Sequence, residues 1–172
     1  NKENNFLKAH KMIIKGKLIL YICIIFINMK ELTLSHVHES IGGKMVDFAG
    51  YSMPVQYEGV NVEHHTVRNK VGVFDVSHMG EIFIKGKNSL DFLQYVLSND
   101  IAKLKPGKVQ YAYMPNHEGG IVDDLLVYQI HHEVYMLVVN ASNIEKDMKW
   151  LNQNNKLDVE ISNESNDYSL LA

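Results

Sequence analysis

The order of apolar runs between residues 81 and 161 constrains the fold more than any other feature of this chain. Runs typical of strands lie at residues 81–85, 109–114, 121–130, 134–139 and 157–161. Apolar residues at helical spacing follow the first strand, at 90–97, and the fourth, at 144–151, where a capping box at 142–145 opens the helix. This order favours a two-layer α+β unit, an antiparallel sheet with helices on one face. We expect a ferredoxin-like arrangement with one extra strand.

Residues 29–80 have a separate, mixed pattern. Apolar residues at helical spacing predict a helix over residues 30–43, and the stretch 44–57, with its glycine and proline, predicts strand and turn. A polar helical stretch is expected over residues 62–70, and a short apolar strand over residues 71–76.

The composition is that of an ordinary soluble globular protein, with 46% hydrophobic residues, 22% charged residues and a formal net charge of -3. Such slight acidity gives no broad basic surface for nucleic acid. The single cysteine, Cys23, excludes an internal disulfide framework and a multi-cysteine zinc site. The nine histidines show no HExxH or comparable ligand spacing, and the adjacent pairs at 64–65 and 131–132 do not share one face of a helix or strand. We therefore expect no metal site.

The first 28 residues differ from the rest of the chain. Their apolar run, at 18–27, is shorter than the roughly 20 residues that a membrane-spanning helix needs, so we expect no membrane partner. A secretory signal of this kind normally ends in small residues, whereas Asn28-Met29 follows the run. We expect residues 1–28 to be extraneous sequence before a true start at Met29, with a targeting segment as the alternative.

Two adjacent aspartates, Asp123 and Asp124, interrupt the strongly strand-forming run IVDDLLVYQI at 121–130. Successive side chains of a strand point to opposite faces, so the two carboxylates cannot face the same way. One of them should lie among apolar neighbours, where an unpaired carboxylate costs several kcal/mol or shifts its pKa. A functional acid would explain this position. An aspartate that caps the turn after Gly119-Gly120, or pairs with a lysine, would explain it equally well.

Three further residues could belong to a site or merely to the packing. Asn140 ends an apolar strand, where its amide could cap the next helix or read a polar heterocycle through its donors and acceptor. Tyr111 lies in a predicted strand and Met79 just before one, and such side chains pack in cores more often than they bind ligands. Spacing alone therefore predicts an α+β domain with one unusual acid.

Four segments form a series of motifs: GGKMVDFAGYSMPVQY at 42–57, GVFDVSHMG at 72–80, GGIVDDL at 119–125 and VVNA at 138–141. Together they resemble the aminomethyltransferase family, the T-proteins of the glycine cleavage system. The match runs in order from Met29 to the end of the chain, and several long motifs in the right order are far more specific than one. The resemblance identifies the chain as an N-terminal fragment of such a protein.

The family fold has three domains around a central cavity, and the resemblance implies that this chain supplies part of it. Residues 29–80 would begin the first folate-binding domain, and residues 81–166 would form the ferredoxin-like second domain. Residues 167–172 would begin the return to the first domain, while residues 1–28 would lie outside the family pattern.

The resemblance also implies a reaction. Tetrahydrofolate attacks an aminomethyl group on the lipoyl arm of the partner H-protein, ammonia leaves, and 5,10-methylenetetrahydrofolate forms. Carried over by motif, Asp124 would be the catalytic carboxylate that hydrogen-bonds the folate and positions its nucleophilic nitrogen. Asn140 and Tyr111 would contact the folate, and Met79 would line its pocket. The donor-rich edge of the pterin suits a carboxylate, and orientation of the amine supplies much of the rate.

Other functions on the same kind of domain remain open. A folate-binding iron–sulfur assembly factor would carry a cysteine-containing KGC-type motif further along, and a demethylating flavoenzyme would carry a flavin domain before Met29. A non-enzymatic binding module would pair Asp124 fully with a lysine or arginine. We expect a cytoplasmic protein, with the mitochondrial matrix as the alternative, because residues 1–28 lack the arginine-rich amphipathic character of a transit peptide.

Overall fold

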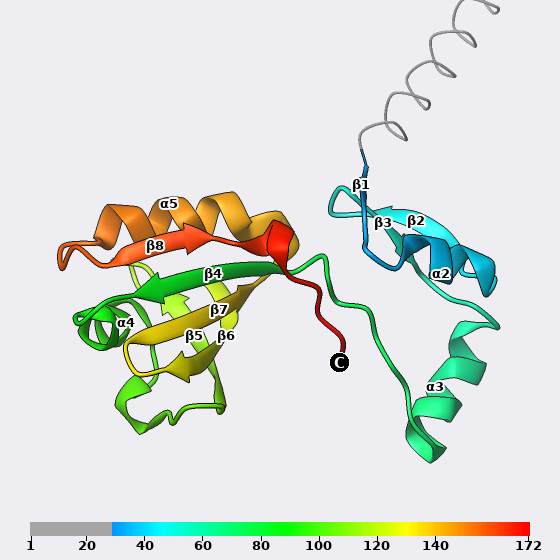
Figure 1. The fold of residues 1–172 in the computed structure, drawn as a ribbon, viewed down its shortest axis with the longest axis horizontal. Coiled ribbons are helices and arrows are strands. Elements are labelled where there is room, and N and C mark those ends of the chain that lie inside the picture. Colours follow the sequence, from blue (N-terminus) through cyan, green and yellow to red (C-terminus); the bar gives the residue numbers. More distant parts are fainter. Residues whose placement is uncertain (1–28) are drawn as a thin grey trace, which may run out of the picture. The chain divides into compact units, whose positions relative to one another are not determined.

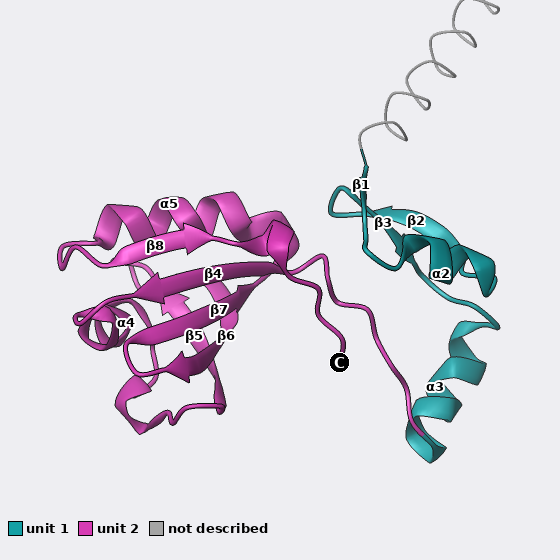
Figure 2. Ribbon diagram, in the orientation of Figure 1, with its two compact units in different colours: residues 1–70 teal, residues 71–172 magenta. Residues whose placement is uncertain are grey.

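The structure, a computed structural model, describes residues 29–172 as two compact units that divide between Lys70 and Val71 (Figure 2). Residues 1–28, which we expect to be extraneous sequence, lie outside the described residues. The N-terminal unit holds a small sheet with two helices, and the C-terminal unit holds a larger sheet. All four candidate site residues belong to the C-terminal unit; they are Met79, Tyr111, Asp124 and Asn140.

The N-terminal unit is built on a three-stranded sheet in the order β1-β3-β2. Its elements are β1 (Lys30–Glu31), α2 (Ser35–Ser40), β2 (Met45–Phe48), β3 (Tyr51–Pro54) and α3 (Val60–Asn69). The strands β2 and β3 form an antiparallel hairpin whose two loop residues, Ala49 and Gly50, have φ of 53° and 81°. Positive φ at both loop residues matches the right-handed twist of a tight hairpin. The strand and turn expected over residues 44–57 are confirmed.

The helix predicted over residues 30–43 is wrong at its start. Strand β1 instead pairs in parallel with β3, and α2 begins only at Ser35. Parallel pairing depends on a partner further along the chain, which local periodicity cannot reveal. The helical stretch expected over residues 62–70 is confirmed, and α3 begins slightly earlier, at Val60.

The C-terminal unit is a five-stranded antiparallel sheet in the order β5-β6-β7-β4-β8, accompanied by two α-helices (Figure 1). Its elements are β4 (Gly80–Lys85), α4 (Ser89–Val96), β5 (Val109–Pro115), β6 (Ile121–His131), β7 (Val134–Val139), α5 (Ile144–Asn154) and β8 (Glu160–Asn163), with short 3-10 helices η1 (Ile101–Lys103), η2 (Ala141–Asn143) and η3 (Ser165–Asp167). Strands β4, β6, β7 and β8 reproduce the ferredoxin-like order, and β5 is the extra strand at the edge. The predicted α+β class is confirmed.

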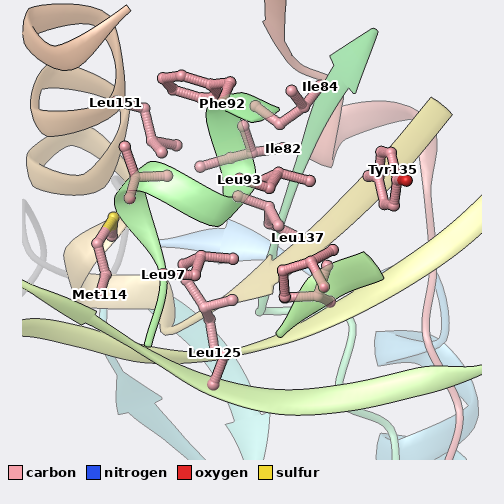
Figure 3. Packing of buried hydrophobic residues seen from close by; sticks show 14 of the residues in the cluster. Ile82, Ile84, Phe92, Leu93, Leu97, Met114, Leu125, Tyr135, Leu137 and Leu151 are labelled. Carbon is pink, nitrogen blue, oxygen red and sulfur yellow. The ribbon is translucent and has the colours of Figure 1, made fainter. Parts of the chain in front are cut away.

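Both helices pack on the same face of this sheet, the helix face (Figure 3). Phe92 and Leu93 of α4 and Leu151 of α5 are fully buried there. They meet alternate strand residues such as Ile82 and Leu137, because successive strand side chains point to opposite faces. Full burial of such a side chain contributes about 1.5–3 kcal/mol, so this layer supplies most of the unit's apolar stabilisation.

Local predictions failed at three places in the C-terminal unit. The strand predicted over residues 71–76 is replaced by an isolated bridge between Asp75 and Leu171. The last strand, predicted over residues 157–161, lies slightly later as β8. The predicted capping box does not form, because Ser142 lies inside η2 and the described chain shows no side-chain cap on α5. Strand ends and caps are set by tertiary contacts more than by local pattern.

Candidate functional site

Strand β6 sends its two aspartates to opposite faces of the sheet, as the two-residue period predicts. Asp123 lies on the helix face and is only 6% exposed. Asp124 is partly buried on the opposite face, the second face, which also carries Tyr111, Tyr113 and Phe83. The two acids therefore have separate surroundings.

One row of residues crosses the second face of the sheet. Tyr113 of β5 is the direct cross-strand partner of Asp124 in β6. The register of β6 with β7, continued past the end of β7, places Asn140 opposite Asp124. The register of β7 with β4, continued by one residue, places Met79 opposite Asn140. Three of the sequence candidates thus stand in one row, contributed by adjacent strands.

Asp124 accepts a side-chain hydrogen bond on each carboxylate oxygen. The Tyr111 O–H donates to Oδ2 at 2.6 Å, and Asn140 Nδ2 donates to Oδ1 at 3.2 Å. The bond to Asp124 raises the pKa of Tyr111 to about 12, so this phenol remains a donor at physiological pH. The ring of Tyr111 meets that of Tyr113 edge to face, with 5.4 Å between centroids. The carboxylate is thus bounded by an aromatic pair on one side and an amide on the other.

The Asn140 side chain does not cap the helix that follows it. No side-chain cap is formed on η2 or α5 within the described chain. Its Nδ2 group instead lies 3.0 Å from Asp123 Oδ1 and 3.2 Å from both Asp124 Oδ1 and the Asp124 carbonyl oxygen. Asn140 therefore connects the two acids around the end of the sheet.

Met79 reaches the site by packing. It contacts an apolar cluster on the second face formed by Phe83, Met136 and Val138. Direct hydrogen bonds join Tyr111, Asp124 and Asn140, whereas Met79 is related to them by its place in the row and by this apolar contact.

The buried Asp123 has a partner that sequence analysis missed, Asp147 of α5. Asn140 and Asn143 donate to Asp123 Oδ1 at 3.0 Å and 2.8 Å, and the carboxyl of the fully buried Asp147, when protonated, can donate to Asp123. Burial opposes ionisation of Asp123, but the hydrogen bonds from Asp147, Asn140 and Asn143 outweigh it and hold its pKa below the ordinary value. Burial, with the hydrogen bond to Asp123 and its charge, raises the pKa of Asp147 to about 8. The sequence feature that could have identified Asp147 is its position on the apolar stripe of α5, between Ile144 and Leu151.

A second missed acid, Glu81 of β4, is fully buried on the second face. Neither of its carboxyl oxygens has a hydrogen-bond donor within residues 29–172. Burial raises the pKa of Glu81 from 4.5 to about 7. The sequence feature that could have identified Glu81 is an acidic residue in the apolar run that begins just after Met79.

The side chains around Asp124 on the second face are a neutral amide and two phenol rings. An ionised carboxylate accepts hydrogen bonds only, so Asp124 suits a ligand that presents N–H or O–H donors. No group of three or more His, Cys, Asp or Glu side chains in residues 29–172 is placed to hold a metal ion. None of the helices in that part of the chain is both long and apolar enough to cross a membrane.

Comparison with known proteins gives consistent matches. The family described as GCVT N-terminal domain matches residues 34–172. The aminomethyltransferase of Flavobacterium psychrophilum is 62% identical over 144 residues, which cover 84% of this chain and 40% of that protein. The aminomethyltransferase of Bacteroides fragilis is 56% identical over 144 residues, with the same coverage of 84% and 40%.

A solved structure agrees with these matches. The glycine cleavage system aminomethyltransferase T from Bartonella henselae has a TM-score of 0.74 and 37% sequence identity, covering 80% of this chain and 38% of that one. The chain therefore spans about 40% of the length of the relatives it matches. With a family match over most of its length and a consistent fold, this chain belongs to the GCVT N-terminal domain family.

Proposed function

We propose that this chain supplies the folate-binding sheet face of an aminomethyltransferase of the glycine cleavage system. In this proposal Asp124 is the carboxylate that positions tetrahydrofolate for reaction. One observation carries it: Asp124 is held by Tyr111 and Asn140 on the second face. The names of the relatives add weight, since those with 49% to 62% identity are aminomethyltransferases.

The polar groups of this face suit the pterin of tetrahydrofolate. A carboxylate offers about four acceptor positions, and side chains of the described residues use one on each oxygen of Asp124. The remaining positions suit the N–H groups along the pterin edge. Tyr111 and Tyr113 are 49% and 43% exposed, so their rings offer an amphipathic surface to a planar heterocycle. Asn140 and Met79 complete the proposed contact set.

The proposed reaction takes place at the nitrogen that Asp124 aligns. The nucleophilic nitrogen of tetrahydrofolate attacks the methylene carbon of the aminomethyl group on the lipoyl arm of the H-protein. The bond from that carbon to the amino group breaks and ammonia leaves. A second nitrogen of tetrahydrofolate then bonds to the same carbon, and the bond from the carbon to the lipoyl sulfur breaks. The two folate N–H protons leave with ammonia and the lipoyl thiol, and 5,10-methylenetetrahydrofolate forms. Holding the nitrogen in line converts an encounter between two molecules into a directed step, which supplies much of the rate. Further folate contacts and the H-protein surface are expected in the part of the relatives that this chain does not span.

The test is the substitution Asp124→Asn in the full-length protein, with tetrahydrofolate binding measured by calorimetry and turnover measured as ammonia release. Loss of a charge-assisted acceptor is expected to weaken binding by about tenfold or more and to lower turnover. Asp91→Asn, the same chemical change on the exposed side of α4, serves as the matched control and should leave both unchanged. Normal folate binding and turnover in Asp124→Asn would exclude this role for Asp124.

A binding module with purely structural acids has less support. It requires a lysine or arginine paired with Asp124, and among the described residues the side-chain partners of Asp124 are Tyr111 and Asn140. The iron–sulfur assembly factor and the demethylating flavoenzyme depend on motifs outside the matched region. Cytoplasmic location remains a prediction.

A further inference from the structure

The amide of Asn140 faces three acceptors at once. These are Asp123 Oδ1, Asp124 Oδ1 and the Asp124 carbonyl oxygen, all within 3.0 to 3.2 Å of Nδ2. An amide can present either its NH2 group or its oxygen, and an oxygen placed among three acceptors would be repelled. The nitrogen is therefore committed to the two aspartates. The amide oxygen is the atom that remains for a ligand.

Asp123 is the more buried of the two carboxylates that accept from Asn140. It is only 6% exposed, and Asn143 donates to the same oxygen, Oδ1, at 2.8 Å. Asp124, in contrast, is the acid proposed to engage the ligand. Once Asp124 shares its oxygens with a ligand, Asp123 is the side-chain acceptor that still fixes the amide of Asn140.

A proton shared with Asp147 keeps Asp123 an acceptor. If both groups were ionised, Asp123 Oδ2 and both oxygens of Asp147 would be buried without a donor in the described chain. Two ionised carboxylates in contact would also repel each other strongly. A proton on Asp147 supplies a donor toward Asp123 and removes this repulsion. Asp123 then remains charged for the two amides that donate to its other oxygen.

We propose that Asp123 is a positioning residue, which fixes the Asn140 amide so that its carbonyl oxygen, together with Asp124, faces a ligand presenting N–H donors. This inference rests on the proposed function. It adds that Asp123, a residue of the helix face, determines that the site on the second face selects a ligand edge carrying N–H donors. Asp123 itself touches no substrate and acts through Asn140.

The orientation of Asn140 can be tested without a ligand. Nitrogen-15 NMR of the chain reports its side-chain NH2 signals, assigned by their loss in Asn140→Ala. Asp123→Asn keeps the shape but removes the charge, and it is expected to move both proton signals toward those of a solvent-exposed amide. Asp147→Asn replaces the acid proton with a permanent N–H donor and is expected to leave the signals in place.

Two results would overturn the positioning role. One is unchanged Asn140 signals in folded Asp123→Asn, and the other is displaced signals in Asp147→Asn. If Asp123→Asn does not fold, Asn143→Ala leaves Asp123 Oδ1 to Asn140 alone and should displace the Asn140 signals in the opposite direction, away from those of an exposed amide; unchanged signals there would count against the proposal.

Folate binding by the full-length protein separates this inference from the proposed function. Asp123→Asn is expected to raise the Kd for tetrahydrofolate about tenfold to a hundredfold, the range for one charge-assisted hydrogen bond. Asp147→Asn should bind like the unaltered protein. Equal loss of binding in both variants would mean that the pair only supports the fold. An unaltered protein that binds no folate would reject the proposed function, while the NMR result would still decide what holds Asn140.

Discussion

Glu81 should make the C-terminal unit less stable as the pH rises. The fully buried side chain holds its proton up to a pKa of about 7, whereas the unfolded chain releases it near 4.5. Between these values the folded state binds a proton that the unfolded state has lost, so raising the pH favours unfolding. The stabilisation from the proton is complete below pH 4.5 and is lost as the pH rises through 7. The substitution Glu81→Gln removes the ionisation while keeping the shape.

The size of the effect follows from the two pKa values. One pKa unit corresponds to about 1.4 kcal/mol, so the rise of the Glu81 pKa from 4.5 to about 7 amounts to roughly 3 kcal/mol. Glu81→Gln is therefore expected to be close to neutral at pH 5 and more stable than the unaltered chain by roughly 3 kcal/mol at pH 8. Asp147 acts in the same direction through its own raised pKa, but it is present in both proteins and largely cancels in the comparison.

The assay is urea unfolding from pH 5 to pH 8.5, followed by tryptophan fluorescence. The chain has one tryptophan, Trp150, which lies on α5 and packs against the core of the C-terminal unit, so the signal reports this unit. Glu118→Gln, at an exposed position, is the matched control and should follow the unaltered chain at every pH. If Glu81→Gln lost stability between pH 5 and pH 8 as steeply as the unaltered chain, the assignment of the raised pKa to Glu81 would be wrong.

Two further substitutions test the site and its support. Tyr111→Phe removes the hydroxyl that donates to Asp124 Oδ2 at 2.6 Å. The affinity for tetrahydrofolate, measured by calorimetry, is expected to fall about threefold to tenfold. An unchanged affinity would remove Tyr111 from the proposed folate contacts. Gly80→Ala would place a methyl group 2.5 Å from Ile144 Cγ1 and 2.9 Å from Val139 Cγ2. Overpacking of this kind should lower the free energy of unfolding by about 1–3 kcal/mol, measured by the fluorescence of Trp150. Full stability would show that α5 can shift.

Much of the C-terminal unit could be predicted from local pattern. Strands β5, β6 and β7 and the two helices each have a period that is visible in a short window of sequence. The same period required Asp123 and Asp124 to separate, and they do. It could not say which acid would lie beneath the helices, because both alternatives satisfy alternation equally. The choice of Asp124 came from the motif resemblance and remains a proposal.

The failures share one cause, dependence on partners distant in sequence. Strand β1 depends on pairing with β3, and residues 71–76 form an isolated bridge, between Asp75 and Leu171, in place of a strand. The pairing of Asp123 with Asp147 joins a strand to a helix across the core. The burial of Glu81 likewise results from chain packing around β4. No local window contains these contacts.

The side chains on the two faces of a β-sheet normally do not contact each other, because each side chain points to one face and the rigid backbone lies between them. Near the start of β6 this separation is interrupted, since one amide, that of Asn140, is bonded to acids on both faces. Substitutions of Asp123 and Asp124 should therefore be non-additive although they lie on opposite faces, because both acids are bonded to Asn140. Sequence changes beneath α5 and sequence changes on the second face are thus not free to vary independently.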